Sequence, residues 1–439
     1  MARSAGSHCS IDSSRANIMS STMRSGFLNL AGSVVLGFIY LVPTNAGRAE
    51  QAHRPADETA AERGYRWLTT KAFFAPTMDP EIFDNLWQVW DEPARSKAEN
   101  ATPEERRKMA YSRYGLTAAP GREGNVPLQY VDNGQGGWAV NCFSCHGGKV
   151  AGVVMPGAPN THIALQTLTD DLERVKQLLG KSTGYMDVGL GNIPLGGSNG
   201  TSNAVIYGVV LGAKRDLDLN YRPTAIQPKL LHHDHDAPPW WNVKRKARLY
   251  ADNFAPKTYR ALMPFLMVPE NGPAEFASFE NDFKDILAWI ESLEPPKYPW
   301  DVDVPLAEKG RVVFNDTCAR CHGTYGPGGE YPEKIVSIEE VGTDPVRLRA
   351  LTPLYRFGHQ ISWFGHYGKS KTIPNPGGYL ASPLDGIWAS APYFHNGSVP
   401  TVGMPIRRNA GSAVLEQSSG YDARLVTQPT NFGLPRHAK

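Results

Sequence analysis

The stretch Cys142-Phe143-Ser144-Cys145-His146 decides the organisation of this chain, and its pattern returns as Cys318-Ala319-Arg320-Cys321-His322. A Cys-x-x-Cys-His run is the attachment signature of c-type haem, because its two thiols can form thioethers with the two vinyl groups of one porphyrin. The histidine that follows reaches the iron as the proximal ligand. The sequence therefore predicts two covalently bound haem c groups, with His146 and His322 as ligands of the two irons.

Two other uses of paired cysteines compete with this interpretation. A zinc site could combine both pairs, but they lie far apart in the sequence and neither has the compact spacing of a zinc finger. A thioredoxin-like dithiol needs a βαβ context, which neither motif has. The haem interpretation uses Cys142, Cys145, Cys318 and Cys321, four of the five cysteines, and leaves no pair for a disulfide.

Length and composition predict a globular protein with two or three domains. The chain has 439 residues, 41% of them hydrophobic, and its 43 glycines and 35 prolines indicate a fold rich in loops. Removing residues 1–49 takes away four basic residues and one acidic residue, so the formal charge changes from +2 to −1. Such a balance provides no field that would attract nucleic acid, and none is expected as a partner.

The N-terminus has the features of a secretory signal peptide. Arg24 precedes an apolar run over residues 27–42, and small residues follow it around residues 44–49. The run is shorter than the roughly 20 residues that usually span a bilayer, so an uncleaved membrane anchor is the alternative. We expect residues 1–49 to be a leader and the protein to be periplasmic or secreted, which fits haem attachment outside the cytoplasm.

Periodic apolar residues divide the rest of the chain. Helices are expected within residues 57–115, at 167–179, at 273–293 and at 306–318, and the Pro-rich run at 294–299 reads as a linker. The expected fold class is mainly α, with long irregular loops. After the leader, the expected parts of the chain are a helical N-terminal segment at 50–120, a first cytochrome-c-like haem domain at 121–294 and a second such domain at 300–439.

Several residues are candidates for the second axial position of each iron, which decides whether a haem moves electrons or binds an exogenous ligand. In the first domain they are His162, residues 232–235, Met155, Met186, Met263 and Met267. In the second they are His359, His366, His395, Met404 and His437. We rank His395 first, because it lies in a tight, turn-rich segment. The basic residues Lys244, Arg245, Lys246 and Arg248 either neutralise haem propionates or form a solvated face.

The segment Pro383–Thr401, with Ala-Pro-Tyr-Phe-His-Asn-Gly at its centre, resembles a motif of the bacterial di-haem cytochrome c peroxidase superfamily. Residues 356–368 and 236–250 are similar to its oxygenase branch, which contains rubber oxygenase and haem-dependent fatty-acid dioxygenases. The resemblance implies a reactive haem on His146 and a six-coordinate, electron-relaying haem on His322. It also implies aromatic residues that shape an apolar substrate pocket near the first haem, for which Trp241 and Phe254 are candidates.

This chain departs from the oxygenase branch at its C-terminal end. Members of the branch are much longer and bring a further histidine to the second haem from a segment after this motif. In this chain His395 or His437 would have to be that ligand of the second haem. The peroxidase pattern instead needs a Met or Tyr after the motif, at a spacing that neither Met404 nor Tyr421 matches.

Together these features predict an exported di-haem c-type cytochrome with oxidoreductase activity towards peroxide or dioxygen. A small redox protein or a quinone-linked donor or acceptor is the expected electron partner, and a small or apolar molecule is the expected substrate. An electron carrier without a catalytic site is the alternative, and a remnant with one functional haem is a third interpretation.

Overall fold

A computed structural model describes residues 57–121, 126–185, 198–224, 231 and 234–402. The expected leader and the candidates Met186, His232, His233, Met404, Tyr421 and His437 lie outside these residues. Contacts group residues 55–439 into one compact unit. Within the described ranges, no helix is both long and apolar enough to cross a membrane.

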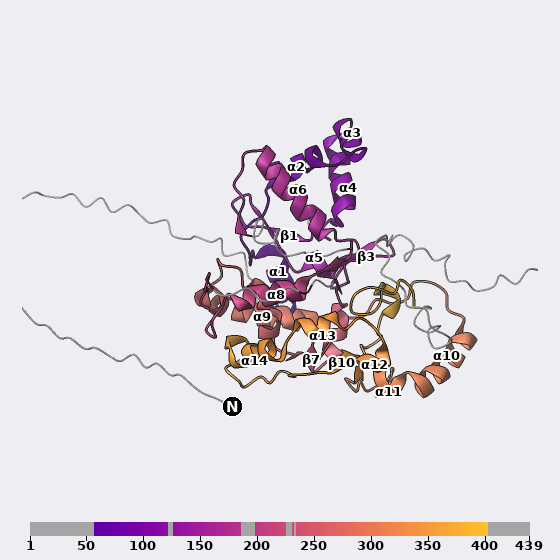
Figure 1. Ribbon diagram of the computed structural model, residues 1–439. Coiled ribbons are helices and arrows are strands. Elements are labelled where there is room, and N and C mark those ends of the chain that lie inside the picture. Colours follow the sequence, from indigo (N-terminus) through magenta and orange to yellow (C-terminus); the bar gives the residue numbers. More distant parts are fainter. Residues whose placement is uncertain (1–56, 122–125, 186–197, 225–230, 232–233, 403–439) are drawn as a thin grey trace, which may run out of the picture. The chain divides into compact units, whose positions relative to one another are not determined.

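The N-terminal part of the described chain is helical, as the sequence predicts (Figure 1). Its elements are α1 (Ala60–Thr70), α2 (Pro80–Asn85), η1 (Leu86–Val89), α3 (Ala94–Glu99) and α4 (Pro103–Tyr114). A capping box begins α4, because the Thr102 side chain accepts from the Glu105 amide and the Glu105 carboxylate accepts from the Thr102 amide. Together with α6 (Leu165–Leu178), the elements α2, η1, α3 and α4 enclose a separate apolar cluster around Phe83 and Trp138.

The middle of the chain surrounds one long helix. The helical elements are α5 (Phe143–His146), α6 (Leu165–Leu178), α8 (Ala204–Ala213), η2 (Trp240–Arg245), η3 (Tyr259–Leu262), η4 (Pro264–Leu266) and α9 (Pro273–Ser292). The predicted apolar face of α9 is confirmed, since Phe276, Phe283 and Ile290 are buried. Helix α1 crosses α9 closely at Gly64, where a Cβ atom would lie 2.1 Å from the carbonyl oxygen of Asp285.

The C-terminal part contains mostly short helices. They are α10 (Val304–Thr317), α11 (Ala319–His322), α12 (Ile338–Val341), α13 (Val346–Ala350), α14 (Pro353–Ile361), η5 (Trp363–Gly365) and η6 (Ile387–Ala389). None of the residues of α10 is buried. A Cβ atom at Gly310 would have no described atom within 4 Å. The described residues therefore form no close helix crossing at this glycine.

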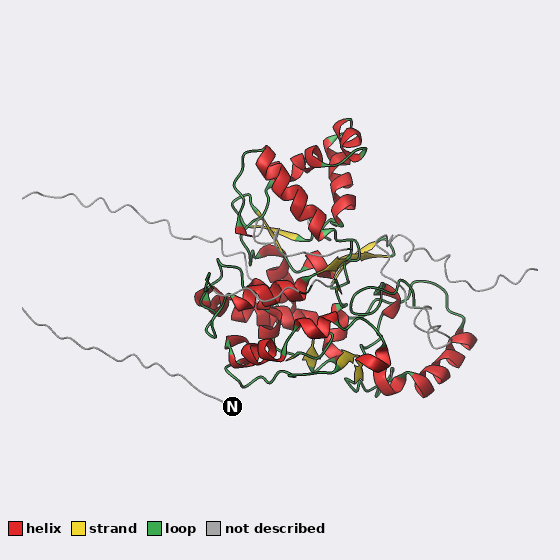
Figure 2. Cartoon of the chain, in the orientation of Figure 1, coloured by secondary structure: helices red, strands yellow, loops and turns green. Residues whose placement is uncertain are grey.

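The expectation of a mainly α chain was too narrow, because 44% of the described residues are helical and 11% are in strands or β-bridges. All described strands pair in two-stranded antiparallel sheets (Figure 2). The pairs are β1 (Tyr130–Asp132) with β2 (Trp138–Val140), β3 (Gly147–Val150) with β4 (Val153–Pro156), β5 (Thr201–Ser202) with β6 (His235–Asp236), β7 (Arg248–Leu249) with β8 (Ala255–Pro256), and β9 (Ile335–Ser337) with β10 (Gly378–Leu380). Because these strands are only two to four residues long, the alternation of apolar and polar side chains that predicts a strand is not recognisable in the sequence.

The largest apolar cluster packs against α9 and reaches both halves of the described chain. It contains Phe143 from the first motif, Trp240, Phe254 and Phe364. Aromatic edge-to-face contacts link its members, for example Phe143 with Trp289 at a centroid distance of 5.6 Å. The first Cys-x-x-Cys-His motif is thus part of the main core.

Candidate functional site

The first motif forms a single helical turn between two small sheets. Cys142 caps α5, and the amide of His146 donates to its carbonyl at 3.1 Å. The segment that follows folds back over the motif, because the Asn160 amide donates to the Cys145 carbonyl at 2.9 Å and the Gly157 amide donates to the carbonyl of His146 at 2.6 Å. The Gly- and Pro-rich sequence after the motif therefore wraps tightly around it.

His146 lies in an aromatic, water-poor environment. Its imidazole stacks on Trp240 with ring centroids 4.2 Å apart and an interplanar angle of 21°. Burial lowers the pKa of His146 to about 3, against a smaller opposing effect of the Pro238 carbonyl. The imidazole is therefore neutral at physiological pH, which is the form that binds iron. Its Nδ1 atom is buried without a hydrogen-bond partner among the described residues.

The thiols of the first motif are held in their protonated form. Burial raises the pKa of Cys142 to about 12, with Cys145 adding to the effect, and burial raises the pKa of Cys145 to about 11. A catalytic dithiol requires the opposite shift, because the thiolate is the nucleophile. The pair is thus poorly suited to redox exchange and compatible with permanent thioether bonds.

The second motif lies in more open surroundings. Cys318, Cys321 and His322 lie at the junction of α10 and α11 and are half-buried, as are the corresponding residues of the first motif, but no residue of α10 or α11 is buried. The Nδ1 atom of His322 donates to the carbonyl oxygen of Ser382 at 2.8 Å. Such a bond fixes the tautomer and ring orientation of a metal-binding histidine and leaves Nε2 available for the metal.

A continuous set of contacts begins at the first motif and leads towards the second. Trp240, which stacks on His146, is followed by Trp241, whose Nε1 donates to the carbonyl oxygen of Asp385 at 2.8 Å. Trp241 is 2% exposed, and Ala389 is part of its apolar cluster. The two tryptophans therefore join the surroundings of His146 to the 383–401 segment.

The same contacts continue from that segment to the second motif. Arg245 forms an ion pair with Asp385 at 3.1 Å, and its guanidinium lies 4.7 Å from the ring centroid of Tyr325. The Tyr325 hydroxyl donates to the carbonyl oxygen of His322 at 3.0 Å. Both motifs are thus attached to one network of aromatic and charged side chains.

His395, the first-ranked axial candidate, is connected to the first motif through a series of contacts. Its ring stacks on Tyr379 of β10 at 4.1 Å and lies 6.2 Å from the ring of His235. Strand β6, which contains His235, pairs with β5, and Ser202 of β5 is hydrogen-bonded to the thiol of Cys145. The assignment of His395 as an iron ligand stays a prediction.

The two substrate-pocket candidates lie at different places. Trp241 lies beside the network described above, whereas Phe254 packs between Tyr250, Tyr355 and His359. The guanidinium of Arg356 lies 5.4 Å from the Phe254 ring. Both aromatic side chains are buried, and their role towards a substrate stays a prediction.

Most of the predicted basic segment is engaged by the protein rather than solvated. Lys244 pairs with Glu294 at 2.6 Å, Arg245 pairs with Asp385, and Arg248 donates to backbone carbonyls. Lys246 is 8% exposed, and burial lowers its pKa to about 8. The interpretation of a solvated basic face is therefore wrong for this segment.

The residues of both motifs fit haem c. Each motif offers two uncrosslinked thiols and one histidine, and the described residues contain no group of three or more His, Cys, Asp or Glu side chains that would suit a bare metal ion. The sequence did not indicate Trp240 as the partner of His146, or Ser382 as the partner of His322. Both contacts connect segments far apart in the chain and leave no local signal.

A haem cytochrome is the class that these features define, and a family comparison supports it. Residues 378–405 match the family described as RoxA-like, cytochrome c-like. The matched residues include the whole 383–401 segment and therefore His395. They support a relationship to RoxA-like cytochromes c and, with it, haem c as the cofactor.

Two proteins of Sinorhizobium fredii (strain NBRC 101917 / NGR234) are similar to parts of the chain. The protein y4iM is 32% identical over 142 residues, which cover 27% of this chain and 32% of y4iM. The protein y4iJ is 26% identical over 166 residues, which cover 25% of this chain and 28% of y4iJ. Both are described as uncharacterized, and the chain spans less than a third of the length of either.

Proposed function

We propose that this protein is an exported di-haem c-type cytochrome with oxidoreductase activity. One observation carries the proposal: the two Cys-x-x-Cys-His motifs lie in unequal environments and are joined by one network. Both histidines are half-buried, but the His146 ring stacks on Trp240 of the main core, whereas His322 bonds to the backbone of Ser382 and no residue of α10 or α11 is buried. Unequal environments favour unequal roles, because burial and axial ligation control what a haem iron does.

In this scheme Cys142 and Cys145 hold the first haem and His146 provides its proximal ligand. Cys318, Cys321 and His322 have these roles for the second. When bound, haem c supplies an iron that can activate peroxide or dioxygen and exchange electrons. The protein's contribution is then orientation, exclusion of water and the polarity of the surroundings.

The chain's own residues would perform these tasks through the contacts already described. Trp240 limits rotation of the His146 ring and removes water from it. Ser382 fixes the His322 ring through its carbonyl oxygen. Trp241, Arg245 and the segment around residue 385 provide a packed path between the motifs. Electrons would enter at the more exposed second motif from a small redox protein or a quinone-linked donor.

The substrate would react at the first motif, where peroxide or dioxygen is activated. A small or apolar molecule fits the aromatic surroundings better than a charged polymer does, and the resemblance to oxygenases points the same way. An extracytoplasmic location agrees with the apolar run at residues 27–42 and with covalent haem attachment. His395 is the proposed second axial ligand of the haem on His322.

The test begins with the number of haems. Denatured protein extracted with acid and acetone should retain two porphyrins per chain in a pyridine haemochrome assay. Native protein should then show one high-spin haem that binds carbon monoxide or cyanide, and one low-spin haem that does not. Two low-spin haems that resist these ligands would instead support an electron carrier.

Replacement of the proposed reactive ligand provides a second test. The variant His146→Gly should keep a thioether-bound haem and lose reactivity, measured as peroxide turnover with a reduced donor and as oxygen uptake with unsaturated lipid or polyisoprene. Full activity of the variant would overturn the assignment of the reactive iron, and no activity of the wild type in either assay would overturn the enzyme proposal.

A further inference from the structure

A row of aromatic side chains leads away from the first motif towards the surface. The imidazole of His146 stacks on Trp240, with ring centroids 4.2 Å apart. The ring of Trp240 lies 5.8 Å from that of Trp289, which in turn lies 5.3 Å from the ring of Tyr65. Aromatic rings at these centroid distances are in direct contact. The row is therefore continuous from the proposed iron ligand to Tyr65, and neither Trp289 nor Tyr65 belongs to the network that joins the two motifs.

The close crossing of α1 with α9 produces the outer part of this row. A Cβ atom at Gly64 would lie 2.1 Å from the carbonyl oxygen of Asp285, so only a glycine allows the two backbones to approach this closely. Tyr65 follows Gly64 directly, and Trp289 lies four residues after Asp285 on the same face of α9. Phe143 of the first motif packs beside both rings, at 6.1 Å from Tyr65 and 5.6 Å from Trp289. The crossing therefore fixes the contact between Tyr65 and Trp289.

The exposure of the row increases at its outer end. Trp240 and Trp289 are each 8% exposed, whereas Tyr65 is half-buried. Indole and phenol side chains give up single electrons far more readily than a phenylalanine ring does. A phenol that loses an electron also releases its hydroxyl proton, so it needs water or a base beside it. The row therefore places the ring that must release a proton where water has access.

We propose that this row carries single electrons from Tyr65 to the haem on His146, so that oxidising equivalents left there by peroxide are discharged at the surface. The inference rests on the proposed function, because peroxide must react at the first motif. It adds a role for Trp289 and Tyr65, which the proposed path between the two motifs does not use.

The electrons and protons of this process balance with a soluble reductant. Reducing one peroxide to two water molecules consumes two electrons and two protons, and the protons come from water. Tyr65 supplies each electron through Trp289 and Trp240 and releases its hydroxyl proton to water. A small one-electron reductant in solution, such as ascorbate, returns one electron and one proton to Tyr65. Two reductant molecules are therefore oxidised for each peroxide.

The experiment is freeze-quench EPR of the full-length holoprotein mixed with hydrogen peroxide in the absence of a reductant, with peroxide consumption measured in parallel. The wild type should show a tyrosyl radical that disappears when ascorbate is added. A nitroso spin trap, followed by peptide mass spectrometry, should place the adduct on the peptide that contains Tyr65. Peroxide consumption without this radical, or with the adduct elsewhere, would overturn the inference and leave the proposed function standing. No peroxide consumption by the wild type would overturn both this inference and the peroxide-dependent form of the proposed function.

Two tyrosine variants locate the radical while removing only one hydroxyl group each. Tyr65→Phe should lose the tyrosyl signal. Tyr259→Phe is the matched control, because Tyr259 is also half-buried and packs against the same apolar cluster, but its ring contacts His366 and none of the rings of the row. This control should keep the signal. Loss of the signal in both variants, or its survival in Tyr65→Phe, would contradict the assignment.

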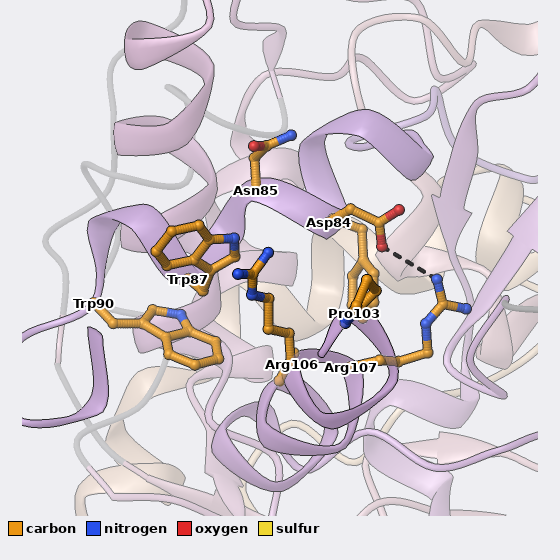
Figure 3. A pocket seen from close by; sticks show the side chains of 9 residues that line it. Asp84, Asn85, Trp87, Trp90, Pro103, Arg106 and Arg107 are labelled. Carbon is orange, nitrogen blue, oxygen red and sulfur yellow. Dashed lines mark hydrogen bonds and ion pairs between the residues drawn. The ribbon is translucent and has the colours of Figure 1, made fainter. Parts of the chain in front are cut away.

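Two tryptophan variants test the path itself. Trp289→Phe keeps an aromatic ring at the helix crossing but removes the indole, and it should reduce the yield of the Tyr65 radical. Trp87 is the matched control, because it lines a pocket between α2, η1 and α4 and packs against a separate apolar cluster (Figure 3). Trp87→Phe should give the wild-type yield, and equal yields in the two variants would contradict conduction through Trp289. Because Trp289 is buried in the core, the tyrosine variants provide a test that does not depend on its packing.

Discussion

Replacing Asp252 with Asn should destabilise the protein strongly, because the carboxylate compensates two buried guanidinium groups. Arg347 donates to both oxygens of Asp252 at 3.1 Å, and Arg356 donates to one of them. The three side chains are 0%, 1% and 0% exposed. Asp252→Asn keeps the shape of the side chain but leaves both cations buried without a counter-charge, which typically costs about 3–5 kcal/mol.

The measurement is chemical denaturation of the holoprotein, followed by far-UV circular dichroism and by tryptophan fluorescence. Coincident transitions would justify comparing unfolding free energies. The control is Glu104→Gln, which breaks the exposed pair between Glu104 and Lys108 and should cause no resolvable change. A loss of stability for Asp252→Asn below about 1 kcal/mol would refute the view that this cluster depends on its single carboxylate.

The same variant has a signature in its pH dependence. Burial by itself would raise the pKa of Asp252, but Arg347 and Arg356 together hold it below its usual value. A carboxyl group with a lowered folded-state pKa stabilises the protein above its unfolded pKa, near 4, and loses this contribution as the pH falls further. The stability difference between wild type and variant should therefore shrink below about pH 4.

Three further outcomes follow from the packing. Gly64→Ala should destabilise the crossing of α1 with α9 markedly, because the new Cβ atom would meet a backbone carbonyl. Gly310→Ala meets no described atom and should be neutral or stabilising by up to about 1 kcal/mol. Thermal melts compare the two variants, and equal effects on the melting temperature would contradict the close approach at Gly64. Lys246→Met should stabilise the protein at neutral pH by up to about 3 kcal/mol, because it removes a buried charge. The gain in stability should disappear as the pH rises from about 8 to 10.5, since the wild-type lysine loses its charge over that range. A pH-independent difference between the denaturation midpoints of wild type and variant would count against this. Trp240→Leu should alter the electronic and EPR spectra of the haem on His146 while leaving the other haem unchanged, and identical spectra would show that the stacked ring does not position the imidazole.

Features of this structure that depend on residues close together in the chain can be predicted from the sequence. The capping box at Thr102 depends on residues three positions apart, and the apolar face of α9 depends on a helical period. Of these, the helix at 273–293 was predicted from the sequence, as were the two attachment motifs. The stacking of Trp240 on His146 joins residues in different segments, and Arg347 and Arg356 lie 95 and 104 positions from Asp252. Pairs of that kind are selected by tertiary packing and have no period or spacing that a single sequence reveals.

The proposed division of roles between the two motifs follows from the opposite demands of reaction and electron entry. A reacting iron benefits from a dry surrounding, because low polarity strengthens each electrostatic contact and excludes side reactions with water. An iron that receives electrons from another protein must lie near the surface. His146 stacks on Trp240 of the aromatic core, whereas no residue of the helices that contain the second motif is buried, so the two environments suit the proposed roles. If the roles were reversed, carbon monoxide would bind to the haem on His322, and a variant at that histidine, rather than at His146, would lose the carbon monoxide signal.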